Sequence, residues 1–476
     1  MTDIEDGPPV NALSAAQLPF LARIRGVRPG AVRVLQSVPR KALVATLLAA
    51  LIAAAGVLRL EAAADHAGQT SADERAYVRL AADLRSTWSY GGPTTAHPLH
   101  WAPGAPVLFA FADALTGDAA SPDRIDTRAA RRAQAVVGAL TVGAAFALAA
   151  MIAGVWAGLA AAAAVAFLPP MITATEHLTS EPLGAFAVTA ALAAVAWAWN
   201  RGRAAGFAVA GAALGVACLV RADVLLAALT LGPAIGVLHA RRAGRRAGLA
   251  ASGATLAGVL VLVGPWSAWA SISERAFVPI TDGGASTLFV GTYLPGNGTM
   301  FGLKHALARE TLRVHPEIRG QPLFRVPERD VLDAVAARRP GLHRDAAISA
   351  ELHRNVRVYV LGHPVPFARM TAGKLWRMWA FPFRGTFHRA RGSTIWLHRV
   401  LVAVALTGLL AALVRRRAPL LGIALLAIGI TTAVDVAFVA EARHAFRLLP
   451  ALVAAGAAGW ALLARGRPRA PETPEG

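Results

Sequence analysis

The stretch "KALVATLLAALIAAAGVLRL" (residues 41–60) is almost wholly apolar. It is as long as a helix must be to cross a hydrocarbon layer of ~30 Å. Similar runs recur along the 476 residues, of which 55% are hydrophobic and only 16% charged, with a mean hydropathy of +0.49. A soluble enzyme carries about a quarter charged residues. The sequence therefore predicts an all-α protein that crosses a membrane many times.

Apolar runs of near-spanning length predict a bundle of about ten transmembrane helices. They are residues 41–60, 133–151, 156–172, 182–199, 204–220, 224–238, 247–266, 397–414, 420–438 and 448–464. An eleventh run, "APVLFAFADAL" (residues 105–115), is too short to span and predicts an interfacial or re-entrant helix.

Basic residues orient the predicted bundle. If residues 105–115 do not cross, four Arg-rich turns fall on the same side as Arg40 and Lys41, and this side is the cytoplasm by the positive-inside rule. The turns are residues 200–203, 240–246, 415–417 and 465–469. This pattern explains the net charge of +20 through the lipid bilayer, without a nucleic-acid partner. The single cysteine, Cys218, excludes a disulfide within the chain.

The same topology divides the chain into segments. We expect cytoplasmic tails at 1–40 and 465–476, a transmembrane core at 41–266 with a first outer loop at 61–132, and closing transmembrane helices at 397–464. Between them, residues 267–396 form a long outer segment with patchy helical periodicity, which predicts a small helical subdomain on the outer membrane face.

Charged residues gather at the predicted outer face. In "ADERAYVRLA" (residues 72–81), Asp73 and Glu74 follow the first span, where a hydrated loop end or a helix N-cap is the simplest explanation. Arg221, in the tight turn "CLVRADVLL", suits a lipid phosphate, and a salt bridge to Asp223 or another acid is the alternative. The stretch "EARHAFRLLP" (residues 441–450) adds Arg443 and Arg447. Together these residues predict an anionic headgroup site near the carboxylates of the first loop.

A series of short motifs follows the acidic pair in a fixed order. The motifs are "DERAYVRLAADL" (73–84), "HPLHWAPGAPVLFAFADALTG" (97–117), "LTSEPLGAFAVTAALA" (178–193), "GVACLVRADVLLAAL" (215–229), "GPWSAWASISERAFVPITDGGASTLFVGTYLPGNGTM" (264–300) and "EARHAFRLLPALVAAGAAGW" (441–460). In order, spacing and membrane side they resemble the GT-C superfamily of polyprenyl-phosphate-dependent glycosyltransferases, and most of all the protein mannosyltransferase and aminoarabinose transferase group (glycosyltransferase family 39).

The resemblance implies a GT-C bundle with juxtamembrane helices in the first outer loop and a catalytic carboxylate at Asp73. It also implies that the acid opening the fourth span is Glu181, that the turn arginine is Arg221, and that the late arginine is Arg443. The chain departs from the family pattern at Ala76, at "APGAP" (residues 102–106), at Ala222, at His444–Ala445 and in "PWSAWA" (residues 265–270), which leaves the donor and acceptor open.

The catalytic residue expected from this comparison is Asp73, as the general base that takes the proton of an acceptor hydroxyl. Substrate-binding roles are expected for Glu74, Tyr77, His97, His100, Trp101, Glu181, Arg221, Arg443 and Arg447. No tight cluster of metal ligands is visible. A divalent cation held by Glu181, Glu74 and His97 or His100 remains an alternative.

The predicted function is inverting transfer of a mannose- or arabinose-like sugar from a polyprenyl-phosphate donor to a glycan, lipid or protein acceptor. The predicted place is the extracytoplasmic face of a bacterial plasma membrane. The alternatives are a transporter or flippase of polyprenyl-linked lipids, and another enzyme that processes polyprenyl phosphates. A transporter would show sequence repeats and charges near the bilayer midplane, whereas these charges gather on one face.

Overall fold

A computed structural model of the chain describes residues 40–64, 71–92, 95, 97–116, 124–383, 392–416 and 418–465. Both predicted tails lie almost wholly outside these residues. Within the described part every regular element is helical. The longer helices are α3 (Arg40–Ala64), α4 (Ala72–Thr87), α5 (Gly104–Ala114), α6 (Thr127–Ala153), α7 (Val155–Phe167), α9 (Glu181–Arg201), α10 (Ala204–Val220), α11 (Leu225–Ala243), α12 (Arg245–Glu274), α17 (Arg344–Asn355), α18 (Pro364–Ala380), α19 (Gly392–Arg416), α20 (Pro419–Ala437) and α22 (Leu449–Ala464).

The shorter helices connect the long ones. They are η2 (Pro98–His100), α8 (Pro169–Thr173), η3 (Ala174–Glu176), η4 (Ala222–Val224), α13 (Gly284–Thr292), η5 (Leu294–Gly296), α14 (Met300–Ala306), α15 (Ala308–Val314), η6 (Pro316–Ile318), η7 (Leu323–Arg325), α16 (Glu328–Ala336), the π-helix η8 (Val356–Leu361) and α21 (Ala442–Phe446).

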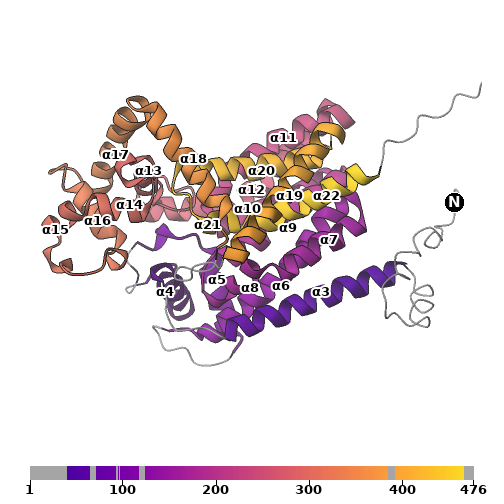
Figure 1. The fold of residues 1–476 in the computed structure, drawn as a ribbon, viewed down its shortest axis with the longest axis horizontal. Helices are drawn as coiled ribbons and strands as arrows, with labels where there is room; N and C mark the ends of the chain where they lie inside the picture. Colours follow the sequence, from indigo (N-terminus) through magenta and orange to yellow (C-terminus); the bar gives the residue numbers. More distant parts are fainter. Residues whose placement is uncertain are drawn as a thin grey trace, which may run out of the picture.

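The long apolar helices run side by side as one bundle (Figure 1). Of the described helices, seven are long and apolar enough to cross a membrane, and an eighth span is formed if the bent pair of residues 155–176 is one span. The prediction of an all-helical, multi-pass membrane protein is confirmed. The predicted count of about ten is not confirmed, because α10 and α22, with 17 and 16 residues, fall short of the spanning length.

The bent span was predicted as one transmembrane run over residues 156–172. The structure bends it by 60° between α7 and α8, where Pro169 and Pro170 prevent helical hydrogen bonds. The break exposes backbone carbonyls of α7, and the fully buried Arg59 of α3 satisfies two of them. Its guanidinium donates to the carbonyl oxygens of Ala166 at 3.1 Å and Val165 at 3.0 Å.

The predicted basic turns meet at one end of the bundle. Side chains there tie the helix ends together: Asn200 Nδ2 donates to Met151 O at 3.1 Å and Arg242 Nη1 to Trp199 O at 3.4 Å. Arg465 donates in the same way to a carbonyl at the end of α6, and Arg416 to one at the end of α22. The start of α3 joins this end, since the Arg40 guanidinium lies over the Trp156 ring. We call it the basic end.

The opposite end carries α4, α5, α21 and a lobe built from α13 to α17 (Figure 1). At ~1.5 Å per residue, the 11-residue α5 is about 16 Å long, so it is too short to cross, as predicted. The lobe has an apolar cluster of its own, which includes Phe289, Leu303, Val331 and Ile348. We call it the outer lobe. The proposed boundary of this segment, residues 267–396, remains a prediction.

Hydrogen bonds from Lys374 of α18 connect the outer lobe to the bundle. Its buried amine donates to Gly291 O of α13 at 3.1 Å and to Phe438 O, just past α20, at 2.8 Å. A Cβ atom on Gly291 would lie 1.8 Å from the same Phe438 oxygen, so only glycine permits this close approach. These contacts fix the position of the lobe over the end of the bundle.

Candidate active site

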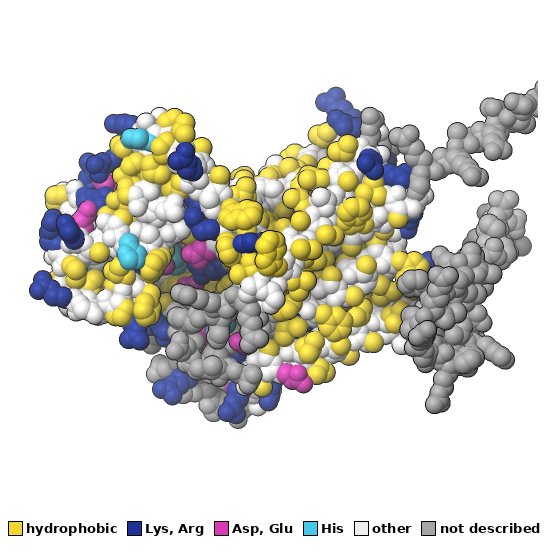
Figure 2. Space-filling model, viewed as in Figure 1, with side chains coloured by type: hydrophobic (Ala, Val, Ile, Leu, Met, Phe, Trp, Pro, Cys, Tyr) yellow, Lys and Arg dark blue, Asp and Glu magenta, His cyan; other side chains and the backbone are white. Residues whose placement is uncertain are grey.

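Charged side chains collect at the end of the bundle opposite the basic end. Figure 2 shows acidic and basic side chains at the base of a hollow between the outer lobe and the transmembrane helices. They come from α4, from the start of α9, from the turn between α10 and α11, and from the segment between α20 and α22. Segments far apart in the sequence therefore supply one polar site at the boundary of an apolar bundle.

Helix α4 is positioned by its first turn. Ser71, not Asp73, is the N-cap: its Oγ accepts from the Glu74 backbone N–H at 3.1 Å, and Glu74 accepts back from the Ser71 N–H at 3.4 Å. The other Glu74 oxygen accepts from the Leu178 N–H at 3.1 Å, and His177 Nδ1 lies 3.6 Å from the carboxylate. Glu74 thus joins α4 to the segment that leads into α9. Its predicted contact with substrate remains a prediction.

The capping of α4 leaves Asp73 free to face the hollow. Its Oδ2 accepts from Arg443 Nη1 at 2.6 Å, and Glu441 Oε2 lies 3.1 Å from Arg443 Nε. The three side chains keep 34–40% of their accessible surface. We call Asp73, Glu441 and Arg443 the open layer, because a ligand in the hollow can reach them.

Electrostatics keep Asp73 ionised. Burial in the hollow raises the pKa of Asp73, but the charge and hydrogen bond of Arg443 outweigh burial. His100 and Arg221 act in the same direction, so the pKa lies below the usual range of an aspartate. The group is a carboxylate at neutral pH and can accept a proton.

A second set of charges lies beneath the open layer. Arg221 Nη2 donates to Asp223 Oδ2 at 2.9 Å, and Arg221 Nη1 lies 3.5 Å from Glu181 Oε1. Ser180 Oγ accepts from Arg221 Nη1 and from the Tyr77 hydroxyl, both at 3.0 Å. The salt bridge of Arg221 to Asp223, which was the alternative to a phosphate-binding role, is present. Glu181 is the first residue of α9, as expected for the acid opening the fourth span.

Arg447 completes this second set, which we call the buried layer. Its Nη2 donates to both oxygens of Asp435, at 2.7 and 2.6 Å, and lies 2.9 Å from Asp223 Oδ2. The Arg447 side chain has no accessible surface. A Cβ atom on Gly184 would lie 3.2 Å from Arg221 Cγ and 3.5 Å from Arg447 Cβ, so this glycine lets both arginine stems pack against α9.

The predicted histidines and Trp101 lie at the edge of the hollow, in and around η2. His100 Nδ1 is 4.0 Å from Asp282 Oδ1, and its ring contacts the Trp101 ring edge-to-face at 4.8 Å. His97 is exposed and borders a cavity of the outer lobe. The two histidines are therefore not gathered with Glu74 and Glu181 into one set of metal ligands. Among the described residues, the one group of three that could hold a metal ion is His315, Asp330 and Asp333.

Several residues of the site were not predicted as site residues from the sequence. Asp223 was considered only as a salt-bridge partner of Arg221, and Asp435 and Glu441 were not named as site residues. Glu328, the first residue of α16, was missed altogether. Burial raises the pKa of Glu328 and the charge of Asp73 adds to this effect, while Arg443 opposes it. No motif or periodicity marks this residue, since only the fold brings α16 over the hollow.

Comparisons with known proteins agree with this architecture. Residues 103–269, about a third of the chain, match the family model described as dolichyl-phosphate-mannose-protein mannosyltransferase. The archaeal oligosaccharyltransferase AglB of Archaeoglobus fulgidus, solved with an inhibitory peptide and a dolichol-phosphate, matches with a TM-score of 0.52 and 16% identity over 89% of this chain. Its apo form gives the same TM-score and identity over 88%. The chain spans about half the length of these archaeal proteins, 50% in each case.

ArnT of Cupriavidus metallidurans, solved with undecaprenyl phosphate, is also similar, with a TM-score of 0.40 and 17% identity over 88% of this chain and 78% of its own. No curated protein matches the chain. The predicted resemblance is confirmed over residues 103–269 by the family model, and the predicted all-helical membrane fold is confirmed by the structure.

Proposed function

We propose that this protein is a membrane glycosyltransferase that moves a sugar from a polyprenyl-phosphate donor to an acceptor hydroxyl on the extracytoplasmic side. One observation carries the proposal. The ionised carboxylate of Asp73 pairs with the partly accessible guanidinium of Arg443, and the guanidinium of Arg221 lies in the buried layer beside Glu181. The match to a mannosyltransferase family model and the dolichol-phosphate in an archaeal protein of the same fold support it.

The side of the membrane follows from charge. The arginine-rich turns lie at the basic end, which the positive-inside rule assigns to the cytoplasm. The hollow is at the other end and therefore faces outward. The donor is an amphiphile whose chain lies in the bilayer and whose phosphate sits at the interface, which is the level of α4 and α21.

The chemistry needs two kinds of group. Asp73 accepts the proton of the acceptor hydroxyl while the hydroxyl oxygen attacks the anomeric carbon. As this bond forms, the bond from the anomeric carbon to the phosphate oxygen breaks. Attack from the face opposite the leaving group inverts the anomeric configuration. The electron pair leaves with the polyprenyl phosphate, whose growing negative charge is stabilised by the guanidinium groups of Arg221 and Arg443.

The ion pairs of the two layers must rearrange when a donor phosphate binds. The two layers hold five carboxylates and only three guanidinium groups. A phosphate that binds Arg443 through Nη1 or Arg221 through Nη2 must displace the present hydrogen bond of that nitrogen to Asp73 or Asp223. We therefore propose that the donor displaces the Asp73–Arg443 pair, which frees the carboxylate for the acceptor. Arg447 is too buried for this role in the present structure.

A transfer assay tests the reaction. Purified full-length protein is incubated with radiolabelled polyprenyl-phosphate mannose or arabinose and with glycans extracted from a bacterial envelope. We expect label in the glycan fraction, stoichiometric release of polyprenyl phosphate, and inverted anomeric configuration by NMR. Retained configuration, or transport of the lipid without bond cleavage, would contradict the proposal.

Loss of Arg221 should weaken donor binding. A hydrogen bond to a charged group contributes roughly 1.5–3 kcal/mol, so Arg221→Gln should raise the Kd of the donor about 10- to 100-fold. The measurement is equilibrium binding of the labelled donor to the purified variant. The matched control is Arg201→Gln at the basic end, where the guanidinium lies over the Trp197 ring and no change is expected. Equal donor affinity in the two variants would remove Arg221 from the phosphate site.

The pairing with Arg443 should be visible in the pH profile. Arg443 lowers the pKa of Asp73, and the carboxylate must be ionised to act as a base. In Arg443→Gln, burial still raises the pKa of Asp73, but the positive charge that lowered it is gone. The pKa of Asp73 therefore rises, and the acid limb of the kcat/KM profile moves to higher pH. Arg443→Lys keeps the positive charge and should move the limb less. Superimposable normalised profiles for all three proteins would show that Asp73 is not the titrating base.

A further inference from the structure

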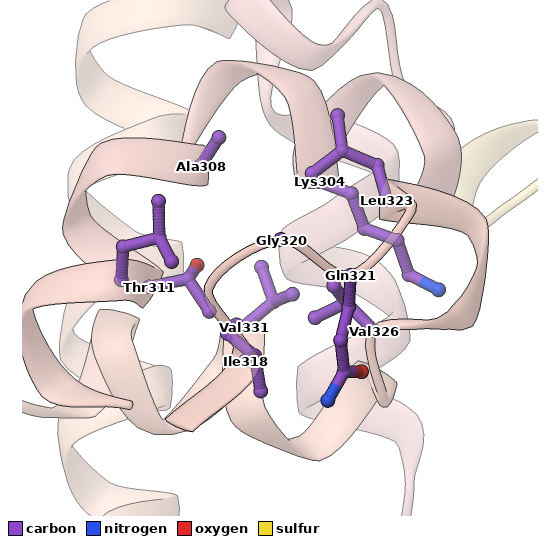
Figure 3. Close-up of a pocket in the computed structure, with 10 residues that line it drawn as sticks. Lys304, Ala308, Thr311, Ile318, Gly320, Gln321, Leu323, Val326 and Val331 are labelled. Carbon is purple, nitrogen blue, oxygen red and sulfur yellow. The ribbon is translucent and has the colours of Figure 1, made fainter. Parts of the chain in front are cut away.

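The outer lobe contains two cavities of very different size. The smaller, under α14 and α15, has a volume of about 60 Å³. Figure 3 shows apolar side chains such as Ile318 and Val331 around it, while the Lys304 amine points away. A water molecule takes up ~30 Å³ of liquid, so this space holds no ligand larger than a water or two.

The larger cavity has the size of a ligand site. Its volume is about 490 Å³, within the 300–1,000 Å³ typical of ligand pockets. It lies between η6, η7, α16 and the start of α17, and it is bordered by His97 of the first outer loop. We call it the lobe cavity. Its lining is His97, His315, Glu317, Ile318, Gln321, Arg325, Pro327, Arg329, Asp330, Asp333 and Arg344.

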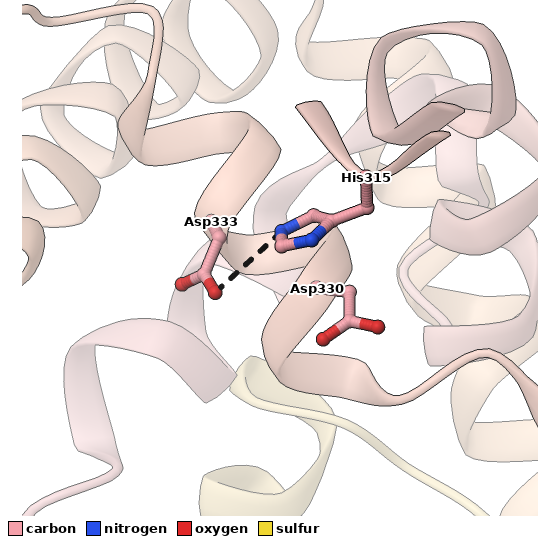
Figure 4. Close-up of side chains that lie close together, drawn as sticks. All are labelled: His315, Asp330 and Asp333. Atoms are coloured by element: carbon pink, nitrogen blue, oxygen red, sulfur yellow. Dashed lines mark ion pairs between the residues drawn. The ribbon is translucent and has the colours of Figure 1, made fainter. Parts of the chain in front are cut away.

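One wall of the lobe cavity resembles a metal site, but arginines already neutralise its carboxylates. Figure 4 shows the His315 ring between Asp330 and Asp333, with Nε2 3.8 Å from Asp333 Oδ2. However, Arg344 Nε donates to Asp333 Oδ1 at 2.5 Å, and Arg329 Nε donates to Asp330 Oδ1 at 3.3 Å. A divalent cation here would lie beside two guanidinium groups that hold its ligands, and their repulsion disfavours it.

The charges of the whole cavity balance. Three carboxylates (Glu317, Asp330, Asp333) face three guanidinium groups (Arg325, Arg329, Arg344). The wall therefore attracts neither an anion nor a cation strongly. It offers fixed donors and acceptors side by side, which suits the many hydroxyl groups of a neutral carbohydrate.

The lobe cavity borders the candidate active site. His97, which lines the cavity, is the N-cap of η2. Leu99 of η2 belongs to the same buried apolar cluster as Leu80 of α4, the helix that carries Asp73. A chain lying in the cavity can thus present its end to the Asp73 carboxylate.

We propose that the lobe cavity is the acceptor subsite and that the acceptor is a neutral carbohydrate chain, not a peptide or a lipid. The inference rests on the proposed glycosyl transfer, because it names the substrate that receives the sugar. The residues that bind the chain are those of the cavity wall, and none of them takes part in bond breaking.

Two variants test the subsite in the full-length protein. Gln321→Trp fills the cavity from an exposed loop position, and Arg325→Ala removes a donor from its wall. The probes are a short linear mannan and a short linear arabinan, with binding followed by saturation-transfer NMR. We expect binding of at least one probe to the native protein, and an affinity about tenfold lower in both variants. The control is Arg309→Trp, an exposed position of α15 outside the cavity, which should bind as the native protein does.

The outcomes separate this inference from the proposed function. Oligosaccharide binding needs no donor, so binding that the two variants weaken supports the cavity even if no polyprenyl-linked sugar is ever transferred. Transfer with an unchanged acceptor KM in both variants would overturn the subsite and leave the proposed function intact. Stronger binding of a Ser/Thr-rich peptide than of either glycan would overturn the carbohydrate assignment. Glycan binding that EDTA abolishes and calcium restores would overturn the inference that the wall binds the chain with its own donors and acceptors, because a bound cation would then hold the glycan.

Discussion

Replacing Asp73 with asparagine is expected to lower kcat for sugar transfer by about 10²- to 10⁴-fold, the usual contribution of a general base. The change is nearly isosteric, and the asparagine oxygen can still accept from Arg443, so α4 should keep its place. Its N-cap, Ser71, and the Glu74 bonds to Ser71 and Leu178 are untouched. Donor binding should therefore be largely preserved while the chemical step fails. Single-turnover transfer from labelled donor, with donor binding measured separately, distinguishes these two effects.

The matched control is Asp126→Asn. Asp126 is the N-cap of α6, where its side chain accepts from the Arg128 N–H, and asparagine caps a helix about as well as aspartate does. This variant should keep the native kcat. A kcat for Asp73→Asn within a factor of two of the control would rule out Asp73 as the base, and the next carboxylates to test would be Glu441 and Glu328.

The fold could be predicted from the sequence because a bilayer constrains the length of apolar segments and the position of basic residues. Apolar length located the spans, and arginine clusters located the basic end, which hydrogen bonds between helix ends now confirm. The differences are local. The Pro169–Pro170 pair indicates a break in the third span, which was predicted only as one apolar run over residues 156–172. The count of about ten is not confirmed, because α10 and α22 are apolar but shorter than the spanning length.

The site could be predicted only in part, because the ion pairs between its side chains depend on tertiary structure. Arg221 and Asp223 are two residues apart, so their salt bridge was a natural alternative. Asp73 and Arg443 are 370 residues apart, and the predicted topology placed them on the same membrane face without showing that they pair. Glu74 shows a missed local signal: Ser71-Ala-Asp-Glu74 is the sequence of a capping box, which explains this carboxylate without a ligand. Glu328 has no such signal and needed the fold.

The second large effect is expected on stability, from Arg447→Met. The Arg447 guanidinium is the direct partner of Asp435 and lies within 2.9 Å of Asp223, in a place without access to water. Removing one partner of a buried ion pair leaves an uncompensated charge and typically costs about 3–5 kcal/mol. We expect a large fall in the Tm of the purified protein. The control, Arg465→Met, removes an arginine at the basic end whose bond is to a backbone carbonyl, and it should change Tm little.

A double variant separates lost charge balance from lost packing. If the cost of Arg447→Met comes from stranded carboxylates, then Arg447→Met with Asp435→Asn should regain part of the stability, because one uncompensated charge is gone. If the cost came from packing of the arginine stem against Gly184 and α9, the second change would give no recovery. Recovery would also support a structural role for Arg447 in the buried layer, where its Nη2 pairs with Asp435 and Asp223 while Nε and Nη1 have no hydrogen-bond partner among the described residues. No recovery, together with a weakened donor affinity in Arg447→Met, would return Arg447 to the phosphate site.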